Sequence, residues 1–171
     1  MASVVDLPPV SKFFIPLPEA NLKTKRRTRL GHVYLCEDLE EGARLFLDAV
    51  THGIPGLWIS ARLPEDLRKR WKLSTTPILW ITQKESREEV TAKPRELGRI
   101  MNIVKHYFLE GIPRAVLFLD CLSVLIRKNG MLSTLGMLKE LKNTCERDHA
   151  ALILSLSGLE QKQKTLVKKL I

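Results

Sequence analysis

The stretch Val33-Tyr34-Leu35-Cys36, followed by Glu37-Asp38-Leu39-Glu40-Glu41-Gly42-Ala43-Arg44, decides the fold. Its apolar first part predicts a buried strand, and residues 39–52 predict the helix that follows. In nucleotide-hydrolysing folds of this layout, the turn between strand and helix is glycine-rich and ends in Gly-Lys-Ser or Gly-Lys-Thr. Here four carboxylates stand in that region, and no lysine or hydroxyl group is placed to hold phosphate and magnesium. The pattern predicts the fold of an ATPase without its chemistry.

Strand-like and helix-like segments alternate along the rest of the chain. The predicted strands are residues 32–36, 57–61, 77–82, 115–119 and 151–156. The predicted helices are residues 39–52, 64–71, 94–110, 122–128, 132–147 and 159–170, and residues 83–91 are predicted to form a polar loop. Apolar strands that alternate with helices are typical of a mainly parallel sheet covered on both faces. We therefore expect a three-layer α/β domain over residues 32–171.

Composition narrows the class of protein. A chain of 171 residues with 44% hydrophobic residues suffices for one domain with a core and a short extension. No apolar run approaches the roughly 18 residues that span a bilayer, and prolines interrupt the N-terminus early. We expect a cytoplasmic protein without membrane contact. The three cysteines share no metal-ligand spacing and are expected to be buried thiols.

Residues 1–31 are predicted to form an extended arm. Four prolines among residues 1–22 disfavour a helix there. The apolar residues Phe13, Phe14 and Ile15 are unusual for a solvated tail, and we expect them to dock on this domain, on a second copy or on another partner. They are the predicted partner-binding residues.

Basic residues are concentrated in two places, within a net charge of +9. The segment 23–29 carries five cations, and the predicted helix 64–71 ends in Arg68-Lys69-Arg70-Trp71-Lys72. Such clusters favour polyanionic partners, although a solvated hinge and an ordinary solvated helix face are the alternatives. The candidate nucleic-acid-binding residues are Lys23, Lys25, Arg26, Arg27, Arg29, Arg68, Lys69, Arg70, Trp71 and Lys72.

Other candidate sites have plain structural explanations. Asp120 follows an apolar strand, as does the aspartate that orients magnesium in ATPases, but it can also cap the helix that starts at Leu122. Trp58 and Trp80 fall within predicted strands and are expected in the core rather than stacked on bases. The four histidines have neither metal-ligand spacing nor a nearby nucleophile motif. We expect no catalytic residue, no metal and no cofactor.

A set of residues in order resembles the archaeal "domain of unknown function 835" family over roughly residues 31–171. The set comprises His52-Gly53-Ile54-Pro55-Gly56-Leu57, Ser60, Pro64, Thr76-Pro77-Ile78-Leu79-Trp80, Leu119-Asp120 and Asn129-Gly130. That family looks like a degenerate relative of the RecA/KaiC class of ATPases, so the resemblance implies a RecA-like core and an archaeal source. It implies no catalytic residues, because the family has no known common function.

These observations lead to two hypotheses. The first is a non-catalytic regulatory protein that binds RNA or the ribosome, in the form of an archaeal subunit-dimerising or hibernation factor acting as a homodimer. Its partner would be ribosomal RNA or a ribosomal subunit. The alternative is a signalling or scaffold module with a degenerate ATPase fold, whose partners are proteins and whose positive charge is incidental.

Overall fold

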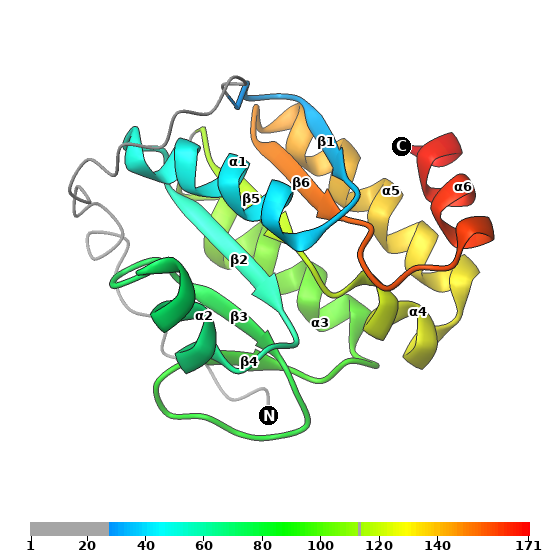
Figure 1. Ribbon diagram of the computed structural model, residues 1–171, viewed down its shortest axis with the longest axis horizontal. Helices are drawn as coiled ribbons and strands as arrows, with labels where there is room; N and C mark the ends of the chain where they lie inside the picture. Colours follow the sequence, from blue (N-terminus) through cyan, green and yellow to red (C-terminus); the bar gives the residue numbers. More distant parts are fainter. Residues whose placement is uncertain (1–27, 113) are drawn as a thin grey trace.

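The computed structural model describes residues 28–112 and 114–171. Within these residues, parallel strands form one sheet in the order β1-β6-β5-β2-β3-β4 (Figure 1). The strands are β1 (Val33–Cys36), β2 (Gly56–Ser60), β3 (Ile78–Ile81), β4 (Val90–Ala92), β5 (Val116–Leu119) and β6 (Ala151–Ser155). The helices are α1 (Leu39–Thr51), α2 (Pro64–Trp71), α3 (Leu97–Asn102), the π-helix η2 (Ile103–Leu109), α4 (Leu122–Asn129), α5 (Met131–Arg147) and α6 (Gln161–Leu170).

Helices cover both faces of the sheet, as the apolar strands predict. Successive side chains of a strand point to opposite faces. Trp58 and Phe118 therefore pack with α1 and α2 on one face, while Ile59 and Leu117 pack with the core side chains of α3, η2, α4 and α5 on the other. The three-layer α/β architecture is confirmed (Figure 1).

Two segments differ from the sequence prediction. The predicted polar loop, residues 83–91, overlaps β4, whose three residues pair with β3 in the register Leu79↔Val90. A strand this short, flanked by charged residues, leaves no periodic signal. The predicted helix 94–110 is divided into α3 and η2, because its second half adopts the wider π-helical winding.

The first helix lies close against the sheet at Gly42. A Cβ atom placed on this glycine would stand 2.5 Å from the ring of Phe118 in β5. Gly42 therefore belongs to the packing between α1 and the sheet rather than to a phosphate-binding turn, and α1 itself begins after the N-cap residue Asp38.

Candidate functional site at the carboxyl edge of the sheet

The turn between β1 and α1 is held by its own carboxylates. Asp38 caps α1, and its Oδ1 accepts a hydrogen bond from the backbone N–H of Glu41 at 2.8 Å. The side chain of Glu41 in turn accepts the backbone N–H of Glu37 at 3.3 Å. Free N–H groups at a helix start are what attract phosphate in nucleotide-binding folds. In this chain, Asp38 takes up one N–H group of the first helical turn, that of Glu41, while Glu41 takes up the N–H of Glu37, which precedes the helix.

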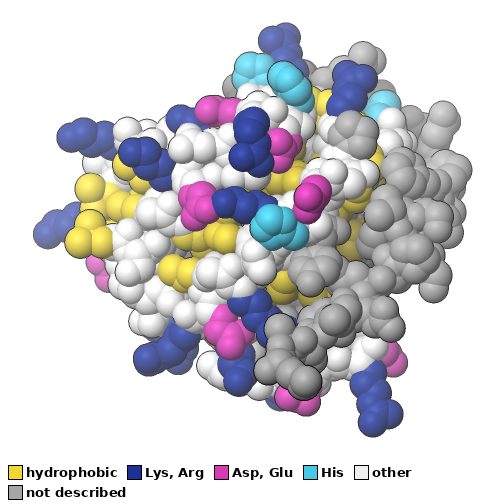
Figure 2. Space-filling view, turned by 180° about the vertical axis from the view of Figure 1, so that it is seen from behind, with side chains coloured by type: hydrophobic (Ala, Val, Ile, Leu, Met, Phe, Trp, Pro, Cys, Tyr) yellow, Lys and Arg dark blue, Asp and Glu magenta, His cyan; other side chains and the backbone are white. Residues whose placement is uncertain are grey.

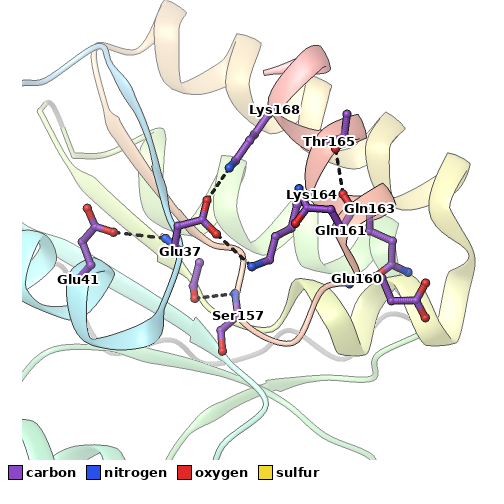
Figure 3. A network of polar contacts seen from close by, with 10 residues as sticks. Glu37, Glu41, Ser157, Glu160, Gln161, Gln163, Lys164, Thr165 and Lys168 are labelled. Atoms are coloured by element: carbon purple, nitrogen blue, oxygen red, sulfur yellow. Dashed lines mark hydrogen bonds and ion pairs between the residues drawn. The ribbon is translucent and has the colours of Figure 1, made fainter.

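The carboxylate of Glu37 contacts two lysines of α6 (Figure 3). Lys164 Nζ donates to Glu37 Oε2 at 3.0 Å, and Lys168 Nζ donates to Oε1. The hydrogen bond from Lys168, followed by that from Lys164, lowers the pKa of the Glu37 carboxyl below its ordinary value. The sequence analysis missed this contact, because nothing in the spacing of residues 37, 164 and 168 shows that they meet.

The attachment of α6 to the domain relies on few contacts. Val167 is its only fully buried side chain among the described residues. A reciprocal cap between Glu160 and Gln163 starts the helix, and Lys142 of α5 donates to the carbonyl of Ile171 at 3.2 Å. The ion pairs with Glu37 therefore form a polar link between α6 and the β1–α1 turn.

Asp120 lies directly after β5 and is held by two neighbouring residues. Its Oδ2 accepts the indole N–H of Trp58 and the hydroxyl of Ser60, both at 2.9 Å. Burial raises the pKa of the Asp120 carboxyl above its ordinary value, and the two hydrogen bonds offset part of that rise. The prediction that Asp120 caps the next helix is wrong, because α4 begins after Cys121 without a side-chain cap.

A cavity of about 320 Å³ opens beside Asp120. Its walls come from the segments that follow β2, β5 and β6, at the edge of the sheet where α/β folds bind ligands. The polar groups that line it belong to Arg62, Asp120, Ser123 and Ser157. Among the described residues, no group of three His, Cys, Asp or Glu side chains is placed to hold a metal ion. The cavity is suited to a small polar molecule or to a side chain of a partner.

The basic cluster of α2 is only partly free for an external partner. Arg68 donates to Glu89 at 2.9 and 2.6 Å and to the carbonyl of Thr76 at 3.0 Å, so it ties α2 to later segments. Arg70 pairs with Glu40 of α1 and lies over the Trp71 ring, 5.2 Å from its centroid.

Trp71 packs inward, with its ring 6.2 Å from that of Trp58. Trp58 is fully buried, which confirms its predicted place in the core, whereas Trp80 is half-buried. Lys69 and Lys72 are exposed and form no ion pair with the described residues. They are the members of this cluster most accessible to an external anion.

The predicted sites in the arm lie almost entirely outside the described residues. This holds for the partner-binding residues and for four of the basic ones, namely Phe13, Phe14, Ile15, Lys23, Lys25, Arg26 and Arg27. Arg29 is described and exposed, and its backbone N–H donates to the Tyr34 hydroxyl at 2.6 Å. The role of the arm stays a prediction.

None of the described helices combines the length and apolar composition needed to cross a bilayer.

Comparison with known protein families identifies the family to which the domain belongs. The family described as "Protein of unknown function (DUF835)" matches residues 35–171. The chain belongs to this family. The resemblance seen in the sequence is thereby confirmed for the domain, and the family name assigns no activity. No curated protein matches the chain.

Solved structures show the same fold in this DUF835 chain and in archaeal proteins. The flagellar accessory protein FlaH from Methanocaldococcus jannaschii matches with a TM-score of 0.54 at 13% identity, over 84% of this chain and 69% of that one. A protein from Pyrococcus horikoshii OT3 matches with a TM-score of 0.54 at 12% identity, over 83% of this chain and 78% of that one. At such identities the likeness shows the RecA-like fold alone.

Proposed function

We propose that this DUF835 chain is a non-catalytic RecA-like domain that acts by binding other proteins, as a scaffold or signalling module. The observation that carries the proposal is that side chains of this chain already contact the polar groups of the β1–α1 turn. Asp38 and Glu41 accept two of its backbone N–H groups, and the Glu37 carboxylate is paired with two lysines. A triphosphate at this turn would have to displace all of these contacts and approach several carboxylates.

Exposed leucines support a protein partner. Leu132 of α5 is 87% exposed, and Leu166 and Leu170 of α6 are 46% and 38% exposed. Figure 2 shows hydrophobic side chains flanked by basic ones at the edge of the molecule on its left, which is the side of α6 in Figure 1. Exposed apolar side chains contribute to protein contacts more than to phosphate contacts. The name of FlaH, an accessory protein, fits a role within an assembly.

Calorimetry with ATP and magnesium tests the non-catalytic part of the proposal. We expect no heat of binding at millimolar nucleotide and no release of phosphate, because the turn carries four carboxylates, two of which already accept N–H groups of the turn, and it contains no lysine. Saturable binding, together with turnover that is lost in Asp120→Asn, would overturn the proposal.

RNA or ribosome binding by a homodimer is the second candidate function. It is supported by the net charge of +9, the basic segment 23–29 and the exposed Lys69 and Lys72. If about six phosphates are contacted, affinity for ribosomal RNA should fall roughly 10³-fold between 50 and 200 mM salt. Replacing Lys25, Arg26, Arg27 and Arg29 by alanine should abolish co-sedimentation with ribosomal subunits.

Capture from cell extract with and without ribonuclease separates the two candidates. A scaffold module retains the same protein partners after ribonuclease treatment, and its quadruple alanine variant retains them as well. A ribosome-binding factor loses its partners in both cases. A gradient profile in which the protein stays at the top would count against the ribosomal candidate.

A further inference from the structure

Two ammonium groups of α6 converge on a single carboxylate. Lys164 and Lys168 stand one helical turn apart and donate to different oxygens of Glu37. The Lys164 side chain is only 23% exposed, whereas Glu37 is 55% exposed. The less exposed partner of the pair is thus a lysine, held in place beside an acid that has access to solvent. Two ammonium groups in this arrangement also match the oxygens of a phosphate group.

The position of this lysine pair is the edge of the sheet where α/β folds bind ligands. Glu37 follows β1, and β1 lies next to β6 in the register Cys36↔Ser155. The backbone N–H of Leu156 donates to the Cys36 carbonyl at 2.8 Å, which keeps the two strand ends together. Figure 3 shows Ser157, from the segment after β6, near the same network. Loops at adjacent carboxyl ends of parallel strands form the ligand crevice in open α/β sheets.

We propose that Lys164 and Lys168 form a binding site for a phosphate group and that Glu37 occupies this site from within the chain. The carboxylate competes with an external phosphate, so the site opens only when Glu37 is displaced or removed. The inference rests on the proposed function, in that the wild-type turn does not itself hold a nucleotide. It adds that the same edge of the domain retains a phosphate site under the control of one side chain.

The Glu37→Gln variant tests this competition with inorganic pyrophosphate as the probe. Glutamine keeps the size of the side chain and removes its charge, so the lysines lose their ionic partner. We expect pyrophosphate to bind Glu37→Gln at least tenfold more tightly than wild type in calorimetry at fixed ionic strength. Backbone NMR shifts should move at residues 36–38 and 161–169. Glu37→Ser provides a second variant in case glutamine keeps the lysines occupied.

Matched controls separate a defined site from general positive charge. Glu140→Gln removes another lysine-paired glutamate, the partner of Lys105, and changes the net charge by the same amount. It should bind pyrophosphate no better than wild type. In the Glu37→Gln background, replacing Lys164 and Lys168 by glutamine should abolish the gain. Replacing Lys162 and Lys169 of the same helix should preserve it, since both are exposed and form no ion pair with the described residues.

Three results would overturn the inference. One is equal affinity of the Glu37→Gln and Glu140→Gln variants for pyrophosphate. Another is a gain that depends on Lys162 and Lys169 as much as on Lys164 and Lys168. The third is that the Glu37→Gln variant binds magnesium-free ATP but does not bind pyrophosphate, which would show that it recognises the nucleoside rather than the phosphate groups. Wild-type binding and turnover of ATP with magnesium would instead contradict the proposed function, and the comparison of the two glutamine variants would still decide the present inference.

Discussion

Replacing Asp120 by alanine is expected to lower the free energy of unfolding by about 2–4 kcal/mol, because two buried donors lose their shared acceptor. The indole N–H of Trp58 and the hydroxyl of Ser60 both donate to Asp120 Oδ2. Trp58 and Ser60 are fully buried, so a donor left without its acceptor carries a desolvation cost. Urea denaturation at pH 7, followed by tryptophan fluorescence and circular dichroism, measures the loss.

The Asp120→Asn variant provides the control and a pH test. Asparagine keeps an oxygen that accepts both hydrogen bonds, so its cost should be smaller than that of alanine. Burial raises the pKa of Asp120 in the folded protein above its ordinary value. At a pH between these two values, the Asp120 carboxyl is protonated in the folded protein and ionised in the unfolded chain. Wild-type stability carries a contribution from this group that falls as the pH rises through that window.

Asparagine does not titrate, so the Asp120→Asn variant lacks this decrease. Its free energy of unfolding relative to wild type should therefore increase from pH 3 to pH 7. Equilibrium denaturation at several pH values measures the difference directly. A relative stability that decreases over this range would show that the structure favours the ionised carboxylate, and an alanine variant as stable as the asparagine variant would show that the two donors find other partners.

Replacing Gly42 by alanine is expected to destabilise the domain by about 1–3 kcal/mol, even though alanine is the better helix former. The added Cβ would stand 2.5 Å from the Phe118 ring, so α1 or that ring has to move. Phe118 is fully buried and packs against Phe46 and Trp58, which limits the movement available to it. Thermal and chemical denaturation should both report the loss.

Gly136 provides the matched control for this prediction. It lies within α5, and a Cβ atom placed on it would meet nothing within 4 Å. Gly136→Ala should therefore raise the free energy of unfolding by about 0.5–1 kcal/mol through helix propensity alone. Equal effects of the two substitutions, in either direction, would contradict the packing role assigned to Gly42.

The layered fold could be predicted because its signals are local. Each buried strand is a short apolar run, and each helix has one apolar face or a recognisable end, such as Pro64 at the start of α2. The strand β4 could not be predicted, because its three residues are too few to show a pattern of their own and its pairing with β3 depends on that neighbour. The π-helical winding of η2 likewise has no pattern that distinguishes it from an ordinary helix.

The candidate site was predictable only in part. The acidic turn was visible in the sequence, and its position after β1 followed from the strand pattern. The partners of its carboxylates were not visible, since Lys164 and Lys168 lie more than a hundred residues away from Glu37 along the chain. For Asp120 the sequence suggested a local cap, whereas the structure places its acceptor atom against donors of β2. Contacts between distant segments determine these roles, and periodicity does not encode them.

The position of β1 at one edge of the sheet also affects how the polypeptide is made. The strand β1 pairs with β6, and Val33 lies opposite Leu152. The backbone hydrogen bonds between these two strands therefore cannot form before the segment around Leu152 is in place. Such a long loop has to close before the pairing contributes stability, which slows the last step of assembly. On the ribosome, β1 therefore cannot pair with β6 until residues 151–155 have been synthesised.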